Sequence, residues 1–269
     1  MGRITQEDKL AAIARLRPID DIFFEMLARN SKVCEEMLRT ILEDDELKVE
    51  NVITQACLRN LYERSVTLDA LCILGDGRRC NIEVQRCDND DHMRRVRYNA
   101  ASITVHESRP GDDFRDVIDL YVVYISEFDL FGEGLTTYHI NKVIKENGKV
   151  IDDGLNVIYV NTAVDDGTAI AELMKCFLQK EVDSPQFPRL SAEVGRLKHT
   201  EGGLNSMCKV MEELFADEKK EYESIIERMD NQLEQKDAQL EQKDAQLKQM
   251  AAELARLRTA LEASQTNKL

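Results

Sequence analysis

The pattern of apolar and polar positions predicts helices at both ends of the chain and strands between them. Residues 5–16 form a short amphipathic segment, and Asp20 or Asp21 caps a second helix with several large apolar side chains. Apolar residues at helical spacing predict a third helix over 32–42. Residues 43–65 are charged and mixed, and they lead into the first predicted strand.

The middle of the chain predicts a mixed sheet. Residues 66–74 are apolar and β-prone apart from one acid, and residues 78–85 alternate polar and apolar side chains. Turn residues 75–77 connect these runs into a predicted hairpin. Strands are then predicted over 117–125, 136–144 and 150–162, and helices over 92–104, 169–177 and from Pro188 to Phe215. This order favours an α/β domain in which helices flank the sheet.

The register of the predicted hairpin decides which polar residues meet. A two-residue loop would place Asp69 opposite Val84 and turn Glu83 to the other face of the sheet. A three-residue loop over 75–77, ending in a glycine that can adopt positive φ, places Asp69 opposite Glu83 instead. Gln85 then shares their face because side chains alternate along a strand.

Two carboxylates that meet across a hairpin repel each other unless a cation lies between them. Mg²⁺ binds through one or two carboxylates together with substrate phosphate, and such a site suits phosphodiester hydrolysis. Asp69, Glu83 and Gln85 are therefore candidate site residues. The same spacing also fits an exposed hairpin that carries ordinary surface acids.

Net charge is unfavourable for a protein that binds nucleic acid. The formal charge of −15 would weaken non-specific contact with phosphate if it were spread evenly. Several arginines, however, cluster in and after the hairpin: Arg78, Arg79, Arg86, Arg94, Arg95 and Arg97. Arg94, Arg97 and Tyr98 fall near one face of the predicted helix, and are candidate nucleic-acid contacts. A solvated charged helix is the alternative interpretation of these three residues.

The carboxyl-terminal part of the chain carries a heptad repeat. Residues 232–238 recur identically as 239–245, and leucine returns every seventh residue at 233, 240, 247, 254 and 261. The spacing predicts a coiled coil that makes the chain a homo-oligomer, weakened by Lys236 and Lys243 at core positions. A single solvated helix is the alternative. We expect two domains, over 1–215 and 216–269.

Other features of the sequence narrow the class of protein. No apolar run is long enough for a transmembrane helix, and the amino terminus lacks the apolar segment of a signal peptide. Seven scattered cysteines without Cys-x-x-Cys spacing indicate reduced thiols rather than a disulfide framework or zinc site. We therefore expect a cytoplasmic chain with no membrane partner.

Several segments together resemble the PD-(D/E)XK nuclease family transposases, also described as recombination-promoting nucleases. The segments lie between residue 15 and about residue 180, and comprise 18–24, 66–69, 81–85, 94–98, 119–125 and 128–131. The resemblance implies a restriction-endonuclease-like, four-stranded mixed sheet flanked by helices. It also implies DNA cleavage dependent on Mg²⁺ or Mn²⁺ and connected with recombination or a mobile element.

The same resemblance assigns roles to individual residues. Asp69 and Glu83 match the metal-binding acids, and Gln85 takes the position where the wider superfamily has lysine. Glu25 is our candidate for the further acid that the amino-terminal helix often supplies. Two other functions stay open at this point: a catalytically silent module that acts as a coiled-coil interaction scaffold, and an enzyme that cuts RNA.

Overall fold

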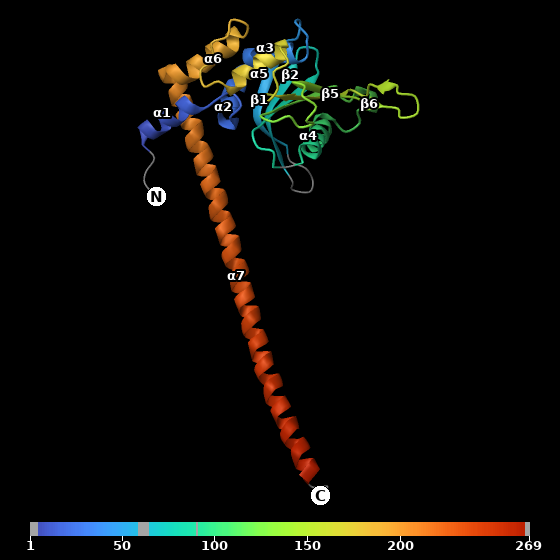
Figure 1. Cartoon of the computed structure of the whole chain (residues 1–269), viewed down its shortest axis with the longest axis vertical. Helices are drawn as coiled ribbons and strands as arrows, with labels where there is room; N and C mark the ends of the chain where they lie inside the picture. The colour runs from blue at the N-terminus through green and yellow to red at the C-terminus, as the bar shows by residue number, and fades with distance from the viewer. Residues whose placement is uncertain (1–4, 59–64, 90, 267–269) are drawn as a thin grey trace. The chain divides into compact units, whose positions relative to one another are not determined.

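The computed structural model describes residues 5–58, 65–89 and 91–266, and its elements are shown in Figure 1. The chain divides into two units, Met1–Met211 and Glu212–Leu269. The first unit contains the strands and the helices up to α6, and the second consists of helix α7 beyond its first turns.

A six-stranded mixed sheet forms the centre of the first unit. Its order is β1-β2-β3-β4-β8-β5, in which β3, β4 and β8 run parallel and the other neighbours are antiparallel. The bounds are Val49–Leu58, Val66–Leu74, Arg79–Gln85, Leu120–Ser126, Leu155–Asn161 and Thr137–Ile140, in that order. The fold class expected from the sequence is confirmed, but the sheet has six strands rather than four.

Two differences from the predicted strands have local causes. Strand β1 was not predicted, because Val49–Leu58 is an edge strand whose side chains are partly polar and largely exposed. The runs 136–144 and 150–162 each divide in two, so that β6, Lys142–Val143, and β7, Val150–Ile151, form a separate small sheet. Asp152 accepts a hydrogen bond from the amide of Gly154, whose φ of 81° turns the chain between β7 and β8.

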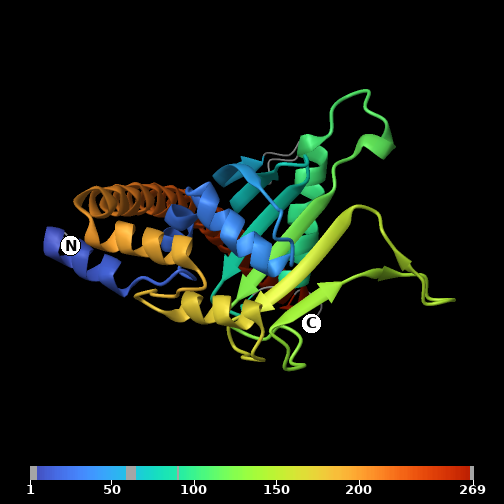
Figure 2. The same cartoon turned by 90° about the horizontal axis from the view of Figure 1, so that it is seen from above.

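Helices cover both faces of the large sheet. Helix α4, His92–Glu107, lies on one face, and α3, Ser31–Ile41, lies on the other, as Figure 2 shows. Helix α2, Asp21–Ala28, packs against β1, β2 and β3. The remaining helices are α1, Gln6–Arg15, α5, Ala169–Leu178, α6, Pro188–His199, and α7, Glu201–Thr266, with a short 3₁₀ helix at Phe114–Asp116. Within the described ranges, no helix is both long and apolar enough to cross a membrane.

The sheet residues that face α4 form a layer of their own. Alternation along β3 directs Arg79, which ion-pairs with Glu107 of α4, and Gln85, which bonds Arg95 of α4, to this side. We call it the α4 face. The apolar side chains buried there include Leu71, Val96, Ala100, Ile103, Leu120, Val122 and Tyr124. Strand β4 is buried on both faces along nearly its whole length, and this burial accounts for its continuous apolar sequence; β8 is buried over its second half.

The second unit presents an apolar stripe to solvent. Leu233, Leu240, Leu247 and Leu254 are between 56% and 62% exposed on helix α7. Helical structure continues through the duplicated heptads, as predicted. The association of this stripe with another helix stays a prediction.

Candidate functional site

The hairpin adopts the three-residue loop. The amide of Leu74 donates to the carbonyl of Arg78 at 3.0 Å, and that of Gly77 donates to the carbonyl of Leu74 at 3.0 Å. Gly77 has a φ of 92°, which a glycine adopts without strain. The ladder pairs Ala70 with Ile82, so the register that places Asp69 opposite Glu83 is confirmed.

Asp69 and Glu83 occupy the closer type of cross-strand position. Arg79 donates its amide to Asp119 next to β4, and Gln85 accepts there from Glu127, so odd-numbered residues of β3 bond toward β4. Glu83 is therefore a non-hydrogen-bonded partner of Asp69, and in such pairs the side chains lie nearest. The amide of Val84 faces β2 instead, and donates to Asp69 Oδ2 at 2.9 Å.

Glu83 is a buried acid with one unmatched oxygen. Its side chain has no solvent exposure, and Oε1 accepts from Asn81 Nδ2 at 2.9 Å. Among the described residues Oε2 has no hydrogen-bond partner, and it lies 3.6 Å from Arg95 Nη2. Burial raises the pKa of Glu83, and the neighbouring charge of Asp69 raises it further. A buried carboxylate in this condition attracts a proton or a metal cation.

Asp69 lies beside Glu83 and is partly buried. Burial raises its pKa, the hydrogen bond from Val84 lowers it, and the charge of Asp21 raises it again. Arg95 acts in the lowering direction and Glu25 in the raising direction. The site is therefore a concentration of negative charge for which a cation is the natural complement.

Gln85 is fixed by two hydrogen bonds. Its Nε2 donates to the carbonyl of Cys87 at 2.9 Å, and its Oε1 accepts from Arg95 Nη1 at 2.9 Å. Asp69, Glu83 and Gln85 thus share the α4 face, as predicted from the strand period. Their roles in catalysis stay predictions.

Helix α2 brings two acids, Asp21 and Glu25, toward this site. Glu25 is buried and close enough to affect the pKa of Asp69, but its Oε1 is ion-paired with Arg29 at 2.7 Å. Asp21 lies one turn earlier and has the larger effect on Asp69. Partial burial raises the pKa of Asp21, whereas the charges of Arg86 and Arg95 lower it.

An ion-pair ring holds the start of helix α2 beside the ends of β3 and β4. Arg17 contacts Asp20 at 3.4 Å and Glu127 at 2.6 Å, and Arg86 contacts the same two acids at 2.9 and 3.1 Å. The ring fixes the position of Asp21, which follows Asp20 directly.

A buried polar chain lies behind Glu83. Tyr124, the neighbour of Glu83 on β4, bonds His92 Nδ1 through its hydroxyl at 2.8 Å. His92 Nε2 lies 3.0 Å from Asp88 Oδ1, so the histidine is fixed at both nitrogens. Burial raises the pKa of Tyr124. His92 therefore supports the wall of the site.

Arg94, Arg97 and Tyr98 line an open groove of about 800 Å³ that also contains Arg95. The start of β2 forms the opposite side of the groove, from Ser65 to Thr67, two residues before Asp69. Arg94 Nε is 3.1 Å from Asp91 Oδ2. Of the arginines on α4, Arg95 is the one that contacts Glu83 and Gln85.

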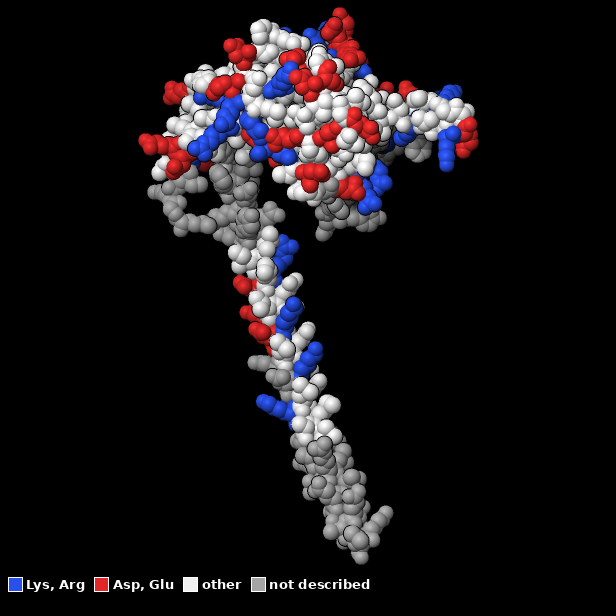
Figure 3. Space-filling view, in the orientation of Figure 1, with Lys and Arg blue, Asp and Glu red and all other residues white. Residues whose placement is uncertain are grey.

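The expected cluster of arginines does not form one basic rim. Arg78 pairs with Asp44 and Asp76 and Arg79 pairs with Glu107, all at the turn end of the hairpin. Figure 3 shows basic and acidic side chains interspersed on the visible face of the first unit. The positive charge near the candidate site comes from Arg86 and Arg95, because the hairpin carries Arg78 and Arg79 to its other end.

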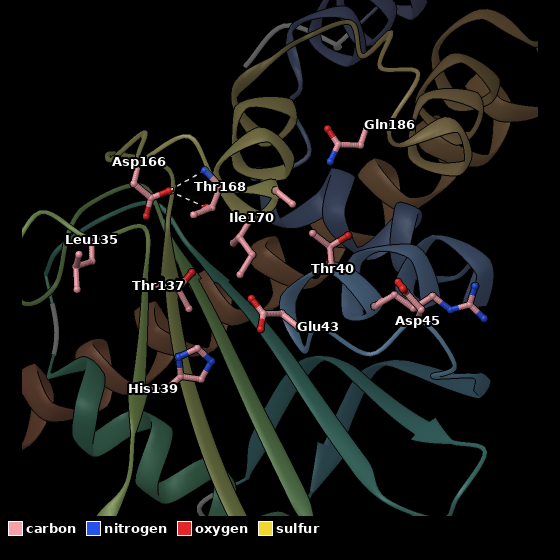
Figure 4. Close-up of a pocket in the computed structure, with 12 residues that line it drawn as sticks. Thr40, Glu43, Asp45, Leu135, Thr137, His139, Asp166, Thr168, Ile170 and Gln186 are labelled. Carbon is pink, nitrogen blue, oxygen red and sulfur yellow. Dashed lines mark hydrogen bonds between the residues drawn. The ribbon is translucent and has the colours of Figure 1, made fainter.

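A separate pocket of about 590 Å³ lies between α3, β5 and the start of α5, and none of the predicted site residues lines it. Figure 4 shows Thr40, Thr137, His139 and Asp166 around this space. Asp166 is occupied by hydrogen bonds from Thr168 and from the amide of Thr136. Glu43 and Asp45 also line the pocket, but both are exposed, so the acids there differ from the buried Glu83 and its neighbour Asp69.

Sequence reasoning did not single out Arg95 or Asp21. For Arg95 a signal was present: His92, Val96 and Asn99 form the buried stripe of α4, and Arg95 borders it. Arg94 and Arg97 lie farther from that stripe and are exposed. For Asp21 the sequence offers no comparable signal, because spacing within α2 does not fix the direction of the helix.

Two carboxylates would supply most of the protein ligands at this site, and such a donor set suits a hard divalent cation. Within the described ranges, Glu83 Oε2 has no hydrogen-bond partner, and the hydrogen bond from the Val84 amide reaches Oδ2 of Asp69 rather than Oδ1. In the same part of the chain, no three His, Cys, Asp or Glu side chains are grouped to bind a metal. Remaining ligands would thus come from water and substrate, as is usual for Mg²⁺.

Comparison with known proteins identifies the family of the chain. No curated protein and no solved structure matches the chain. The family model described as PD-(D/E)XK nuclease family transposase matches residues 21–167, which include α2, the hairpin and α4. This match covers more than half of the chain, and the chain therefore belongs to the PD-(D/E)XK nuclease family transposases.

Proposed function

We propose that the chain is a DNA endonuclease that depends on Mg²⁺ or Mn²⁺ and acts in recombination or in a mobile element. Membership of the family supports a nuclease- or transposase-related role. The observation that carries the proposal is the facing pair of Asp69, which is partly buried, and Glu83, which is fully buried and has no hydrogen bond to Oε2. A buried carboxylate whose charge is only partly compensated by its neighbours is typical of a site that binds a metal cation.

The two carboxylates would hold the metal, and the surrounding residues prepare them for it. A bound Mg²⁺ activates water and offsets negative charge on the phosphate. Asn81 holds Oε1 of Glu83, and the Val84 amide holds Oδ2 of Asp69. Each acid is thereby oriented by one oxygen while the other is available to the cation.

The groove along α4 would receive the nucleic acid. Arg94 and Arg97 carry positive charge for backbone phosphates, and Tyr98 offers an aromatic ring beside them. The groove reaches Arg95, which contacts Gln85 and Glu83, so a strand bound there would pass the carboxylate pair. We assign the nuclease to residues 1–215 and a coiled-coil helix to residues 216–269.

A plasmid-nicking assay tests the proposal. Wild-type protein should convert supercoiled DNA to nicked or linear forms with Mg²⁺ or Mn²⁺, and EDTA should abolish this conversion. Asp69→Ala and Glu83→Ala should lose cleavage while keeping their circular dichroism spectra. Glu107→Gln is a matched control, because Glu107 pairs with Arg79 at the other end of the α4 face. Loss of cleavage in the control alone, or cleavage by both alanine variants, would overturn the assignment.

The second candidate function is a silent nuclease fold that assembles protein partners. The exposed leucines of α7 favour it, because a long apolar stripe on a solvent-exposed helix calls for a partner. Absence of metal-dependent cleavage of any DNA or RNA, together with self-association of the full chain, would make this function preferred.

A further inference from the structure

We propose that Arg95 acts directly on the scissile phosphate, and that Gln85 is a positioning residue for Arg95 rather than a metal ligand. This inference rests on the proposed function, and deepens it by naming the side chain that contacts the substrate phosphate and the residue that holds this side chain in position.

Both ends of the Gln85 side-chain amide are held by hydrogen bonds. Its amide nitrogen is committed to the Cys87 carbonyl, so its amide oxygen points toward Arg95 Nη1 at 2.9 Å. An oxygen that accepts from a guanidinium is a poor ligand for a second cation at the same place. Through these two hydrogen bonds Gln85 holds the guanidinium of Arg95 in position.

Arg95 provides positive charge to the acids of the site. Its guanidinium lowers the pKa of Asp69, of Glu83 and of Asp21, so it lies within electrostatic range of all three acids. A phosphodiester that enters the site adds further negative charge, and still more develops there during the reaction. A fixed cation at this point stabilises that developing charge.

Arg95 keeps N–H donors that its bond to Gln85 does not use. Guanidinium has five N–H donors, and the hydrogen bond to Gln85 uses one of them. Glu83 Oε2 lies at 3.6 Å from Nη2, which is beyond hydrogen-bond distance. The Arg95 side chain is 36% exposed and lines the groove, whereas Arg79 is 19% exposed and tied to Glu107 and Gly77. Arg95 can thus bond phosphate oxygens without breaking its bond to Gln85.

Moving the positive charge from position 95 to position 85 tests the inference. Arg95→Gln should lower the single-turnover cleavage rate by about 100-fold, the usual cost of removing one such donor. Arg79→Gln, which removes the same charge from the other end of the α4 face, should retain the wild-type rate. Gln85→Lys should not accelerate the wild-type enzyme, because it places a second cation beside Arg95. The double variant Arg95→Gln/Gln85→Lys should recover at least about tenfold over Arg95→Gln.

Gln85→Leu separates a positioning residue from a metal ligand. It should lower the cleavage rate in the wild-type background and have no further effect once Arg95 is already glutamine, since the two residues act as one unit. The Mn²⁺ affinity of Gln85→Leu, measured by titration calorimetry without DNA, should equal that of wild type. A weaker Mn²⁺ affinity, or additive rate losses, would show that Gln85 acts on the metal and would overturn the inference.

Binding of Mn²⁺ also tests Arg95 independently of cleavage. Removing a cation from the site should tighten Mn²⁺ binding several-fold in Arg95→Gln, because the acids are then less neutralised. Loss of Mn²⁺ binding in this variant would show that Arg95 merely holds the site together, and would overturn the inference. If wild-type protein cleaves nothing, the proposed function fails, while tighter Mn²⁺ binding still supports the charge assignment to Arg95.

Discussion

Neutralising Glu83 should stabilise the metal-free protein, and increasingly so as the pH rises. Burial and the neighbouring Asp69 raise the pKa of Glu83 to about 8, and burial raises that of Asp69 to about 6. In the unfolded chain both acids titrate near their ordinary values of about 4. Between these values the folded protein binds more protons than the unfolded chain, so the free energy of unfolding falls as the pH rises.

The magnitude follows from the displacement of the pKa. One pKa unit corresponds to about 1.4 kcal/mol, so raising Glu83 from 4.5 to about 8 corresponds to at most roughly 5 kcal/mol. Because the hairpin can open slightly and admit water, we expect Glu83→Gln to gain about 2 kcal/mol at pH 8.5 relative to wild type. At pH 4 the two proteins should differ little, since Glu83 is then protonated in the folded state and mostly protonated in the unfolded chain.

Urea unfolding in EDTA, followed by circular dichroism at several pH values, measures this difference. Glu107→Gln provides the control, and should lose about 0.5 kcal/mol through its partly buried ion pair with Arg79. Added Mg²⁺ should raise the unfolding midpoint of wild type at pH 8.5, and should have little effect on Glu83→Gln. If wild type is as stable as Glu83→Gln at pH 8.5 without metal, the two carboxylates do not repel each other and the reasoning is refuted.

Three further outcomes are expected from other parts of the chain. The full chain should self-associate in light scattering at tens of micromolar while a chain ending at Ala216 should be monomeric; a monomeric full chain contradicts the coiled coil. Tyr124→Phe should lower the free energy of unfolding by about 1 kcal/mol, because His92 Nδ1 loses a buried partner, and an unchanged urea midpoint would exclude that hydrogen bond. Gly77→Ala should cost about 1 kcal/mol in thermal unfolding, because alanine is strained at a φ of 92°, and equal stability would mean that the turn relaxes freely.

The hairpin illustrates what local sequence can determine. Strand parity and a glycine in the third loop position were sufficient to place Asp69 opposite Glu83, because a side-chain period of two leaves only two alternatives. Strand β4 could also be predicted from the sequence, since a short, continuous apolar run is typical of a strand buried on both faces. Both features depend on neighbours close in sequence.

Features that depend on tertiary packing were missed. Strand β1 has polar side chains on its exposed side, and Gln55 within it has a φ of 50°, so its pattern is irregular. Its irregular residue lies between Thr54 and Ala56, which pair with the two neighbours of Asp69. The contact between Arg95 and Gln85 joins residues on different elements, and only the docking of α4 on the sheet determines it.

Because the heptad of α7 is duplicated, the length of this helix can change while its leucine stripe keeps facing the same direction. Each residue of an α-helix turns by about 100°, so seven residues return to within about 20° of the starting direction and advance the helix by about 10 Å. Deleting residues 232–238 therefore shortens the helix and leaves its leucines on one side. A deletion of five residues would instead turn everything beyond it by about 140° and break the stripe. The length of α7 can therefore change by whole heptads without breaking its leucine stripe.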